Sequence, residues 1–281
     1  MNGAPPSAQR PQLIAHAKAY PYARPAMPAL LTGEHIRALR RFDPVSGEYL
    51  LATAADESPT DTVAGHLPPR AVENPLLAVG ANGSPAVLGR KLSALGHRPL
   101  VVMLQARVLD HAVVYSAHLS AYGSVPATIQ HSPGSYARVA VLFMPPEQLE
   151  ALHASESLGV NYAFGRLDTA PVALESGETL EAPSAYLSLH GALMRNGEPL
   201  ALDAISQSCP YPALTQESAL NYVCELVSPG VALDDFIVKN VLDGAWRSEN
   251  ILSLSRMARR GPWVGFRPLR PETLEQTVAG D

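Results

Sequence analysis

The pattern of apolar and polar positions changes near Pro75. From there to about residue 190, short apolar runs alternate with turn residues, which is typical of strands. These runs are residues 76–79, 99–109, 111–120, 125–130, 135–144, 160–170 and 183–191. Helical spacing interrupts the series at 145–156 and returns over 215–228, 232–246 and 248–261, with Thr215 and Ser248 as expected caps. Many strands with a few helices predict an α+β fold instead of a regularly alternating Rossmann sheet.

The segment before Pro75 follows a different pattern. Prolines in residues 1 to about 30 fix φ and remove hydrogen-bond donors, so an extended arm is expected there. A short helix is expected over 32–42, with Thr32 as its N-cap, followed by a strand over 47–54. Residues 55–74 are polar and contain prolines, which predicts a loop.

Length and composition set the broad class of the protein. The chain has 281 residues, 47% of them hydrophobic and 17% charged, which is typical of a globular protein. The change of pattern divides it into an N-terminal extension, residues 1–74, packed on or flanking a main domain, residues 75–281. The net charge is −5, and no basic run is interleaved with aromatic residues, which argues against nucleic acid as a partner.

Several classes of protein are disfavoured by what the sequence lacks. No apolar stretch is long enough to span a bilayer, and the N-terminus does not have the pattern of a secretory signal. Cys209 and Cys224 form no C-x-x-C pair and no disulfide framework, so a cytoplasmic protein with reduced thiols is expected. Neither a zinc-spaced cluster, a P-loop nor a G-x-S-x-G elbow is present, so no metal or cofactor is expected. The oligomeric state is left open.

A glycine turn joins the apolar run and the helical pattern within LLAVGANGSPAVLGRKLSAL, residues 76–95. Ser84 can cap the following helix, whose free N–H groups and dipole favour a carboxylate or a phosphate. Gly80 and Gly83 permit close approach to the backbone, and Asn82 offers both a donor and an acceptor. A plain strand-to-helix turn explains the spacing equally simply, because such turns are common.

Glu156 is the second candidate. It lies where the helical spacing of ALHASESLGVNY ends, just before the strand that carries Tyr162. A carboxylate at such a junction can project into a cavity and act as a general base. The alternative is a solvated surface glutamate, the usual environment of this residue type.

Three stretches, taken in order, resemble the gamma-glutamylcyclotransferase-like family. The Tyr-Gly-Ser-Asn loop motif of that family is similar to Val79-Gly80-Ala81-Asn82. Its Ala-Thr-Ile segment with a Pro-Gly turn is similar to ATIQHSPG, residues 127–134. Its strand, helix and catalytic glutamate before a tyrosine-bearing strand are similar to residues 138–168, which places Glu156 at the catalytic position. The likeness covers roughly residues 75 to 245.

The resemblance implies a mixed, partly closed β-barrel with inserted and C-terminal helices. It also implies a set of substrate-binding residues: Val79, Gly80, Ala81, Asn82, Gly83, Ser84 and Tyr162. Val79 and Ala81 lack the hydroxyl groups of the family loop, and a family tyrosine in the C-terminal helices has its counterpart near Ser218 or Tyr222. A substrate other than the usual ones therefore stays open.

The activity implied is that of a cofactor-independent cyclotransferase. A small γ-glutamyl substrate would close on itself to 5-oxoproline and release an amine, with Glu156 as general acid and base. Two alternatives remain. The same fold can serve as a non-catalytic metabolite-binding or interaction module, or as an enzyme for another amide or carboxylate metabolite.

Overall fold

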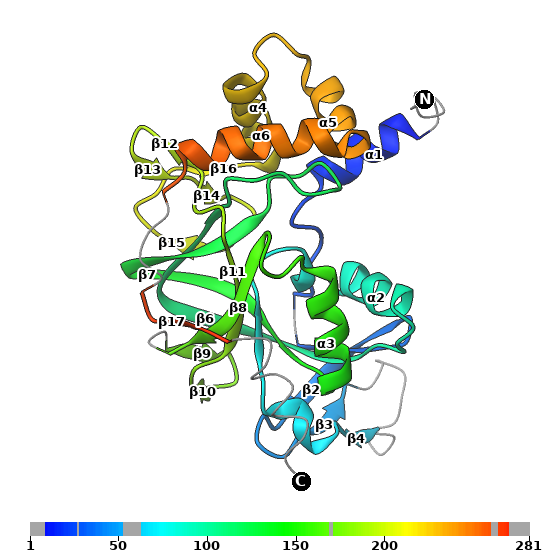
Figure 1. Ribbon diagram of the computed structural model, residues 1–281. Coiled ribbons are helices and arrows are strands. Elements are labelled where there is room, and N and C mark those ends of the chain that lie inside the picture. The colour runs from blue at the N-terminus through cyan, green and yellow to red at the C-terminus, as the bar shows by residue number, and fades with distance from the viewer. Residues whose placement is uncertain (1–8, 27, 53–62, 169–170, 260–263, 270–281) are drawn as a thin grey trace.

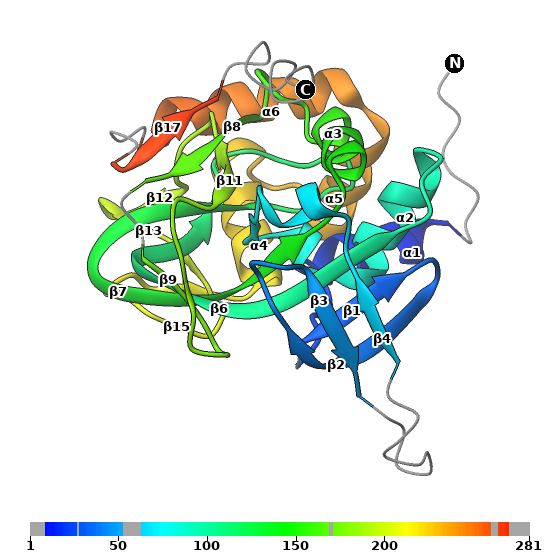
Figure 2. The same cartoon turned by 90° about the horizontal axis from the view of Figure 1, so that it is seen from below.

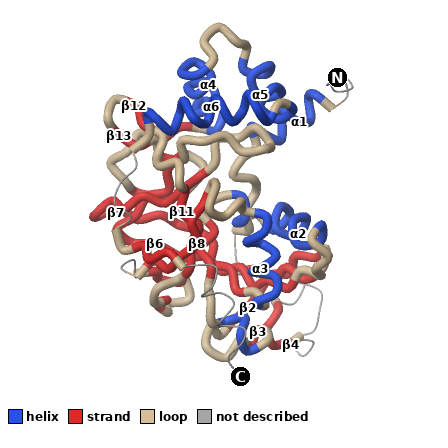
Figure 3. Tube along the Cα trace, viewed as in Figure 1, coloured by secondary structure: helices blue, strands red, loops and turns tan. Residues whose placement is uncertain are grey.

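The computed structural model describes residues 9–26, 28–52, 63–168, 171–259 and 264–269 (Figure 1). A large twisted sheet occupies the centre of the molecule. One group of helices covers an end of the sheet, and two further helices lie together beside it, as the colouring of Figure 3 shows. The expected α+β class is confirmed.

The main sheet has the strand order β17-β8-β11-β5-β7-β6-β1-β2-β3-β4. These strands are β1 (Ala29–Thr32), β2 (His35–Phe42), β3 (Glu48–Leu51), β4 (Ala64–His66), β5 (Leu76–Ala78), β6 (Leu100–Tyr115), β7 (Ala127–Phe143), β8 (Tyr162–Leu167), β11 (Ser184–Ser188) and β17 (Phe266–Pro268). The short strands β9 (Val172–Leu174), β10 (Thr179–Leu180), β14 (Ala201–Leu202), β15 (Gln207–Ser208) and β16 (Ala213–Leu214) attach to it, and β12 (Met194–Arg195) pairs with β13 (Glu198–Pro199).

The sheet is not closed into a barrel, so that part of the expected fold was wrong. Closure requires hydrogen bonds between the two end strands. In the described part of the chain the path ends at β17 on one side and β4 on the other, and these two strands do not pair. The reason is that β1 pairs with β6, and β2, β3 and β4 then extend the sheet away from β17 (Figure 2).

Strands β6 and β7 form the centre of the core. Each was expected as two strands separated by a turn, but each is continuous, with a register shift between Leu109 and His111. Asp110 has a φ of 55°, and its carboxylate accepts a hydrogen bond from Gly134 N at 2.8 Å. Pairing on both sides of this bulge keeps the two strands in one ladder. Successive residues such as Met103 and Leu104 enter different apolar clusters, so both faces of the sheet are buried.

Two expectations for the N-terminal segment were wrong. Residues 32–42 were expected to be a helix, but β2 forms there because β1 and β3 supply hydrogen-bond partners on both of its sides. The expected extended arm contains the helix α1 (Arg10–Lys18), whose early Pro11 sits where a helix tolerates proline. Residues 1–8 of that arm lie outside the described residues.

The expected strand over 47–54 is present as β3, within the described residues. The expected loop over 55–74 contains β4 and a short 3₁₀ helix, η1 (Pro69–Val72), in its described part. Residues 53–62 lie outside the described residues.

The C-terminal helices are α4 (Gln216–Val227), α5 (Leu233–Leu242) and α6 (Gly244–Met257), and they gather with α1 at the top of Figure 1. Thr215 accepts a hydrogen bond from Ser218 N, which confirms it as the cap of α4. Ser248 is not a cap, because α6 begins earlier and Asp243 caps it through Trp246 N. No helix in the described residues has the length and apolar character needed to cross a membrane. Cytoplasmic localisation stays a prediction.

Candidate functional site

The glycine turn follows β5 directly. Residues Ala81–Gly83 form the 3₁₀ helix η2, and α2 (Pro85–Ala94) begins after it. Ser84 occupies the N-cap position of α2, but its side chain makes no capping hydrogen bond, so that part of the expectation was wrong. Gly83 and Ser84 are buried and do not line the cavity described below, whereas the preceding residues 79–82 do.

Glu156 lies at the C-terminal end of α3 (Pro146–Ser155), which packs beside α2. Its side chain is only 11% exposed, and it faces the glycine turn across the space between the two helices. The alternative of a solvated surface glutamate therefore does not hold. The helix ends at this position, and the chain then turns through Ser157, at φ 50°, into β8.

Glu156, Asn82 and Lys91 form a closed triangle of hydrogen bonds. Asn82 Nδ2 donates to Glu156 Oε1 at 3.1 Å, and Lys91 Nζ donates to the same oxygen at 2.5 Å. Lys91 Nζ also donates to Asn82 Oδ1 at 3.0 Å, which fixes the orientation of the amide. Among the described residues every hydrogen bond to this carboxylate uses Oε1. Glu156 Oε2 is therefore free to accept a proton or a hydrogen bond from a bound molecule.

The triangle lies in the wall of a cavity of about 440 Å³. Four tyrosines line this cavity, and each comes from a different part of the chain: Tyr20 after α1, Tyr122 between β6 and β7, Tyr162 in β8 and Tyr186 in β11. Burial raises the pKa of each of these phenols well above its usual range. All four hydroxyl groups are therefore neutral at physiological pH. Tyr162 was expected at the site, and the structure places it there.

Two of the tyrosine hydroxyls are held by other groups of the protein. Ala127 N donates to Tyr20 Oη at 2.7 Å, and His153 Nδ1 lies 2.7 Å from Tyr186 Oη. Burial lowers the pKa of His153 to about 4, so its ring is neutral at pH 7. The cavity thus combines one ion pair with fixed, neutral hydroxyl groups, an arrangement suited to a small polar molecule that carries carbonyl or carboxylate oxygens.

Gly80 and Gly83 permit a close approach, but the approaching groups belong to the protein itself. A Cβ at Gly80 would lie 2.4 Å from Tyr20 Oη, and a Cβ at Gly83 would lie 2.9 Å from Arg24 Cζ. The expectation that these glycines admit a ligand to the backbone was incomplete. The N-terminal segment fills the space that the missing side chains leave.

Sequence reasoning missed several residues of this site. No local sequence pattern marks four of the residues that line the cavity, because they reach it only through the packing of distant elements. These residues are Lys91, Tyr20, Tyr122 and Tyr186. The expected C-terminal tyrosine counterpart is also absent, since neither Ser218 nor Tyr222 lines the cavity. Tyr222 Oη instead donates to Met194 O at 2.9 Å.

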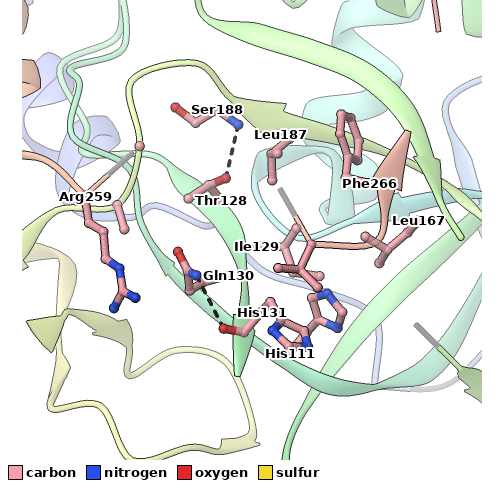
Figure 4. Close-up of a pocket in the computed structure, with 13 residues that line it drawn as sticks. His111, Thr128, Ile129, Gln130, His131, Leu167, Leu187, Ser188, Arg259 and Phe266 are labelled. Atoms are coloured by element: carbon pink, nitrogen blue, oxygen red, sulfur yellow. Dashed lines mark hydrogen bonds between the residues drawn. The ribbon is translucent and has the colours of Figure 1, made fainter. Parts of the chain in front are cut away.

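A second cavity, of about 430 Å³, is lined by residues of β6, β7, β8, β11 and β17 (Figure 4). The rings of His111 and His131, a cross-strand pair, lie side by side, with Leu167, Leu187 and Phe266 on the same side of the cavity. In the described part of the chain, no three His, Cys, Asp or Glu side chains are placed to hold a metal ion. This cavity therefore offers two imidazoles beside apolar and neutral polar side chains and one arginine, without a carboxylate among its lining residues.

Comparison with known proteins gives little that bears on the site. No family model matches the chain, and no curated protein matches it. Among solved structures, a gamma-glutamyl cyclotransferase is 17% identical, covers 73% of this chain and 98% of its own, and has a TM-score of 0.32. A crystal structure of an uncharacterized protein from Homo sapiens is 17% identical, covers 74% and 98%, and has a TM-score of 0.33. At these scores neither likeness carries an argument about the chemistry of this chain.

Proposed function

We propose that the protein is a cyclotransferase that converts a γ-glutamyl amide to 5-oxoproline and a free amine. The observation that carries this proposal is the state of Glu156, which lines a cavity with neutral hydroxyl groups and is anchored through Oε1, while Oε2 has no hydrogen-bond partner among the described residues. A general base needs a fixed position and one free lone pair, and this carboxylate has both. The likeness of the loop and glutamate motifs to the family described above supports the same chemistry.

The reaction is intramolecular, so the main task of the protein is to hold the substrate bent. The α-amino nitrogen attacks the γ-carbonyl carbon, a new C–N bond closes the five-membered lactam, and the original amide C–N bond breaks. Glu156 Oε2 takes one proton from the attacking nitrogen and returns it to the departing amine, so no external acid is consumed. The tyrosine hydroxyls that face the cavity would hydrogen-bond the carbonyl oxygen as negative charge develops on it.

The test is detection of 5-oxoproline by mass spectrometry from a panel of γ-glutamyl amines, γ-glutamyl amino acids and glutathione. Wild-type protein should form product, and Glu156→Gln should reduce its rate by about 10²- to 10⁴-fold. Glu150→Gln is the matched control, because Glu150 lies on the same helix but is exposed. Normal turnover in folded Glu156→Gln would exclude Glu156 as the base. No product from any substrate would exclude the proposed reaction for that panel.

Lys91 favours a second candidate function, a metabolite-binding module or an enzyme for another amide or carboxylate. The ammonium group of Lys91 balances the charge of Glu156. A partly buried carboxylate that holds a bound molecule, without exchanging protons with it, needs such a partner to stay charged. In that case the protein would bind L-glutamate or 5-oxoproline, measured by calorimetry, without forming product. Loss of this binding in Tyr162→Phe, with no turnover in wild type, would select the binding function.

A further inference from the structure

Arg24, in the segment between α1 and β1, makes an unusual set of contacts with the glycine turn. Its Nη2 donates to Val79 O at 2.6 Å and to Gly80 O at 2.9 Å, and its Nη1 donates to Ala78 O at 3.3 Å. One guanidinium therefore spans three successive carbonyl groups at the point where the chain leaves β5. Hydrogen bonds from a charged donor are stronger than those between neutral groups, and the planar guanidinium fixes their relative directions.

Tyr20, four residues earlier, reaches the same turn and also the cavity. It is only 4% exposed, and its hydroxyl oxygen accepts the hydrogen bond from Ala127 N. Among the described residues no hydrogen bond donated by this hydroxyl group is found. A buried donor without a partner carries a substantial free-energy cost, so an oxygen supplied by a bound molecule would satisfy it.

The N-terminal segment is attached to the main domain independently of these two residues. Ser124 Oγ donates to Ala17 O at 2.9 Å, and Ala17 is fully buried. Lys18 Nζ lies 2.8 Å from Glu217 Oε1, at the start of α4, and 3.2 Å from Asp234 Oδ1, at the start of α5. The segment is therefore held on α4, α5 and the loop of Ser124 by contacts that involve neither Tyr20 nor Arg24.

We propose that the segment of residues 10–24 is a built-in wall of the site, with Tyr20 contacting the substrate and Arg24 positioning the glycine turn. Tyr20 donates its hydroxyl proton to a carbonyl or carboxylate oxygen of the substrate. Arg24 holds the carbonyl groups of residues 78–80 on the side away from the cavity. The identity of that substrate rests on the proposed function, whereas the positioning role of Arg24 does not.

The role of Tyr20 is tested with Tyr20→Phe, which keeps the ring and removes only the hydroxyl. If the hydroxyl bonds the carbonyl oxygen in the transition state, kcat for 5-oxoproline formation should fall on the order of 100-fold with little change in KM. Tyr22→Phe is the control, because the Tyr22 hydroxyl contacts His16 and does not line the cavity. An unchanged kcat in Tyr20→Phe, or an equal loss in both variants, would overturn the contact.

The role of Arg24 is tested without any ligand. Gly83 N and Ser84 N each donate within the turn at 3.0 Å, so their hydrogen exchange reports its opening. Exchange of these amides should be at least about tenfold faster in Arg24→Gln than in wild type. In Arg24→Lys, which keeps the charge, exchange should be slower than in Arg24→Gln. Arg90→Gln is the control, since Arg90 is on α2 and, in the described part of the chain, its side chain donates a hydrogen bond to Ala86 O and none to the turn.

Unchanged exchange in Arg24→Gln would overturn the positioning role. The two measurements separate this inference from the proposed function. Absence of 5-oxoproline from wild type would remove the reaction and the substrate contact of Tyr20 together. The exchange measurement would still decide whether Arg24 holds the turn.

Discussion

Two of the cavities in the described part of this protein have nearly equal volumes, about 440 and 430 Å³, yet they differ in the state of their polar groups. In the second cavity some of the polar side-chain atoms are engaged by the backbone. His111 Nδ1 lies 2.8 Å from Leu109 O, and Thr128 Oγ1 accepts from Ser188 N (Figure 4). In the first, Glu156 Oε2 and the Tyr20 hydroxyl proton have no partner among the described residues. Volume alone does not distinguish a site; unsatisfied, converging polar groups do.

The difference follows from where the lining residues lie. The second cavity draws His111, Thr128 and His131 from within the paired lengths of β6 and β7, where the backbone groups are paired along the ladder. The first draws its residues from the end of β5, the end of α3 and the segment before β1. The ends of strands and helices, and the segments that join them, project side chains into space that no regular element fills. Four predictions test this contrast, in decreasing order of expected effect.

The largest effect should come from Lys91→Met, which removes the cation beside Glu156. The pair is partly buried, with side-chain exposures of 25% and 11%, so its loss should lower the free energy of unfolding by about 2–3 kcal/mol. Arg267→Met is the matched control, because it breaks the exposed pair with Asp168 and should cost less than about 1 kcal/mol. Urea denaturation measures both. Equal losses in the two variants would show that burial does not make the Lys91–Glu156 pair contribute more to stability than an exposed pair.

The next effect is a pH dependence that arises from His153, which supports Tyr186. Burial lowers its pKa to about 4, whereas the unfolded chain takes up the proton near pH 6.5. Because the ring stays neutral in the folded state, the free energy of unfolding of the protein falls as the pH decreases from about 6.5 towards 4. The loss should be about 2 kcal/mol between roughly pH 7.5 and pH 5. Chemical denaturation at several pH values measures it.

His153→Gln should flatten this dependence, while His35→Gln, at an exposed position, should leave it unchanged. Burial also lowers the pKa of His111 in the second cavity. The same experiment on His111→Gln therefore compares the two cavities directly. A slope that His153→Gln does not change would assign the acid sensitivity elsewhere.

A smaller effect is expected from Gly80→Ala, because the new Cβ would lie 2.4 Å from Tyr20 Oη. We expect a loss of about 1–2 kcal/mol in the free energy of unfolding. In the double variant with Tyr20→Phe the clash disappears, since the next nearest atom is 3.5 Å away, and the two losses should not add. In Gly89→Ala the new Cβ would make only ordinary contact, 3.7 Å from Leu31 Cδ1, so this variant should be neutral or stabilising. Full additivity would mean that Tyr20 does not press on the turn.

The smallest effect is expected in the second cavity. Arg259 lines it with an exposed side chain, and Arg259→Gln should change the free energy of unfolding by less than about 0.5 kcal/mol. Formation of 5-oxoproline should be unchanged as well. A clear loss of product in this variant would show that the second cavity takes part in the reaction, and the contrast between the cavities would fail.

Local patterns were sufficient for much of the fold. The apolar runs around β5, β8 and β11, and the helices α3 and α4, lie where the spacing indicates, because each contains its own periodicity and end signals. Residues 32–42 were assigned wrongly, since His35–Phe42 is a strand only through its partners on either side. The bulge at Asp110 was also missed, because a strand that continues past a turn-like residue depends on pairing across the ladder.

The sequence by itself determined the α+β class and singled out Asn82 and Glu156. In the structure Asn82 Nδ2 lies 3.1 Å from Glu156 Oε1. Turn residues and a helix end are local features, so they are visible without a partner. Only the tertiary structure decided that Lys91 bridges these two residues, that Tyr20 lines the same cavity and that Arg24 bonds the glycine turn. Those side chains meet because β1 pairs with β6 and α1 packs on α5. Contacts between segments so far apart in sequence depend on how the whole chain packs, which no single stretch encodes.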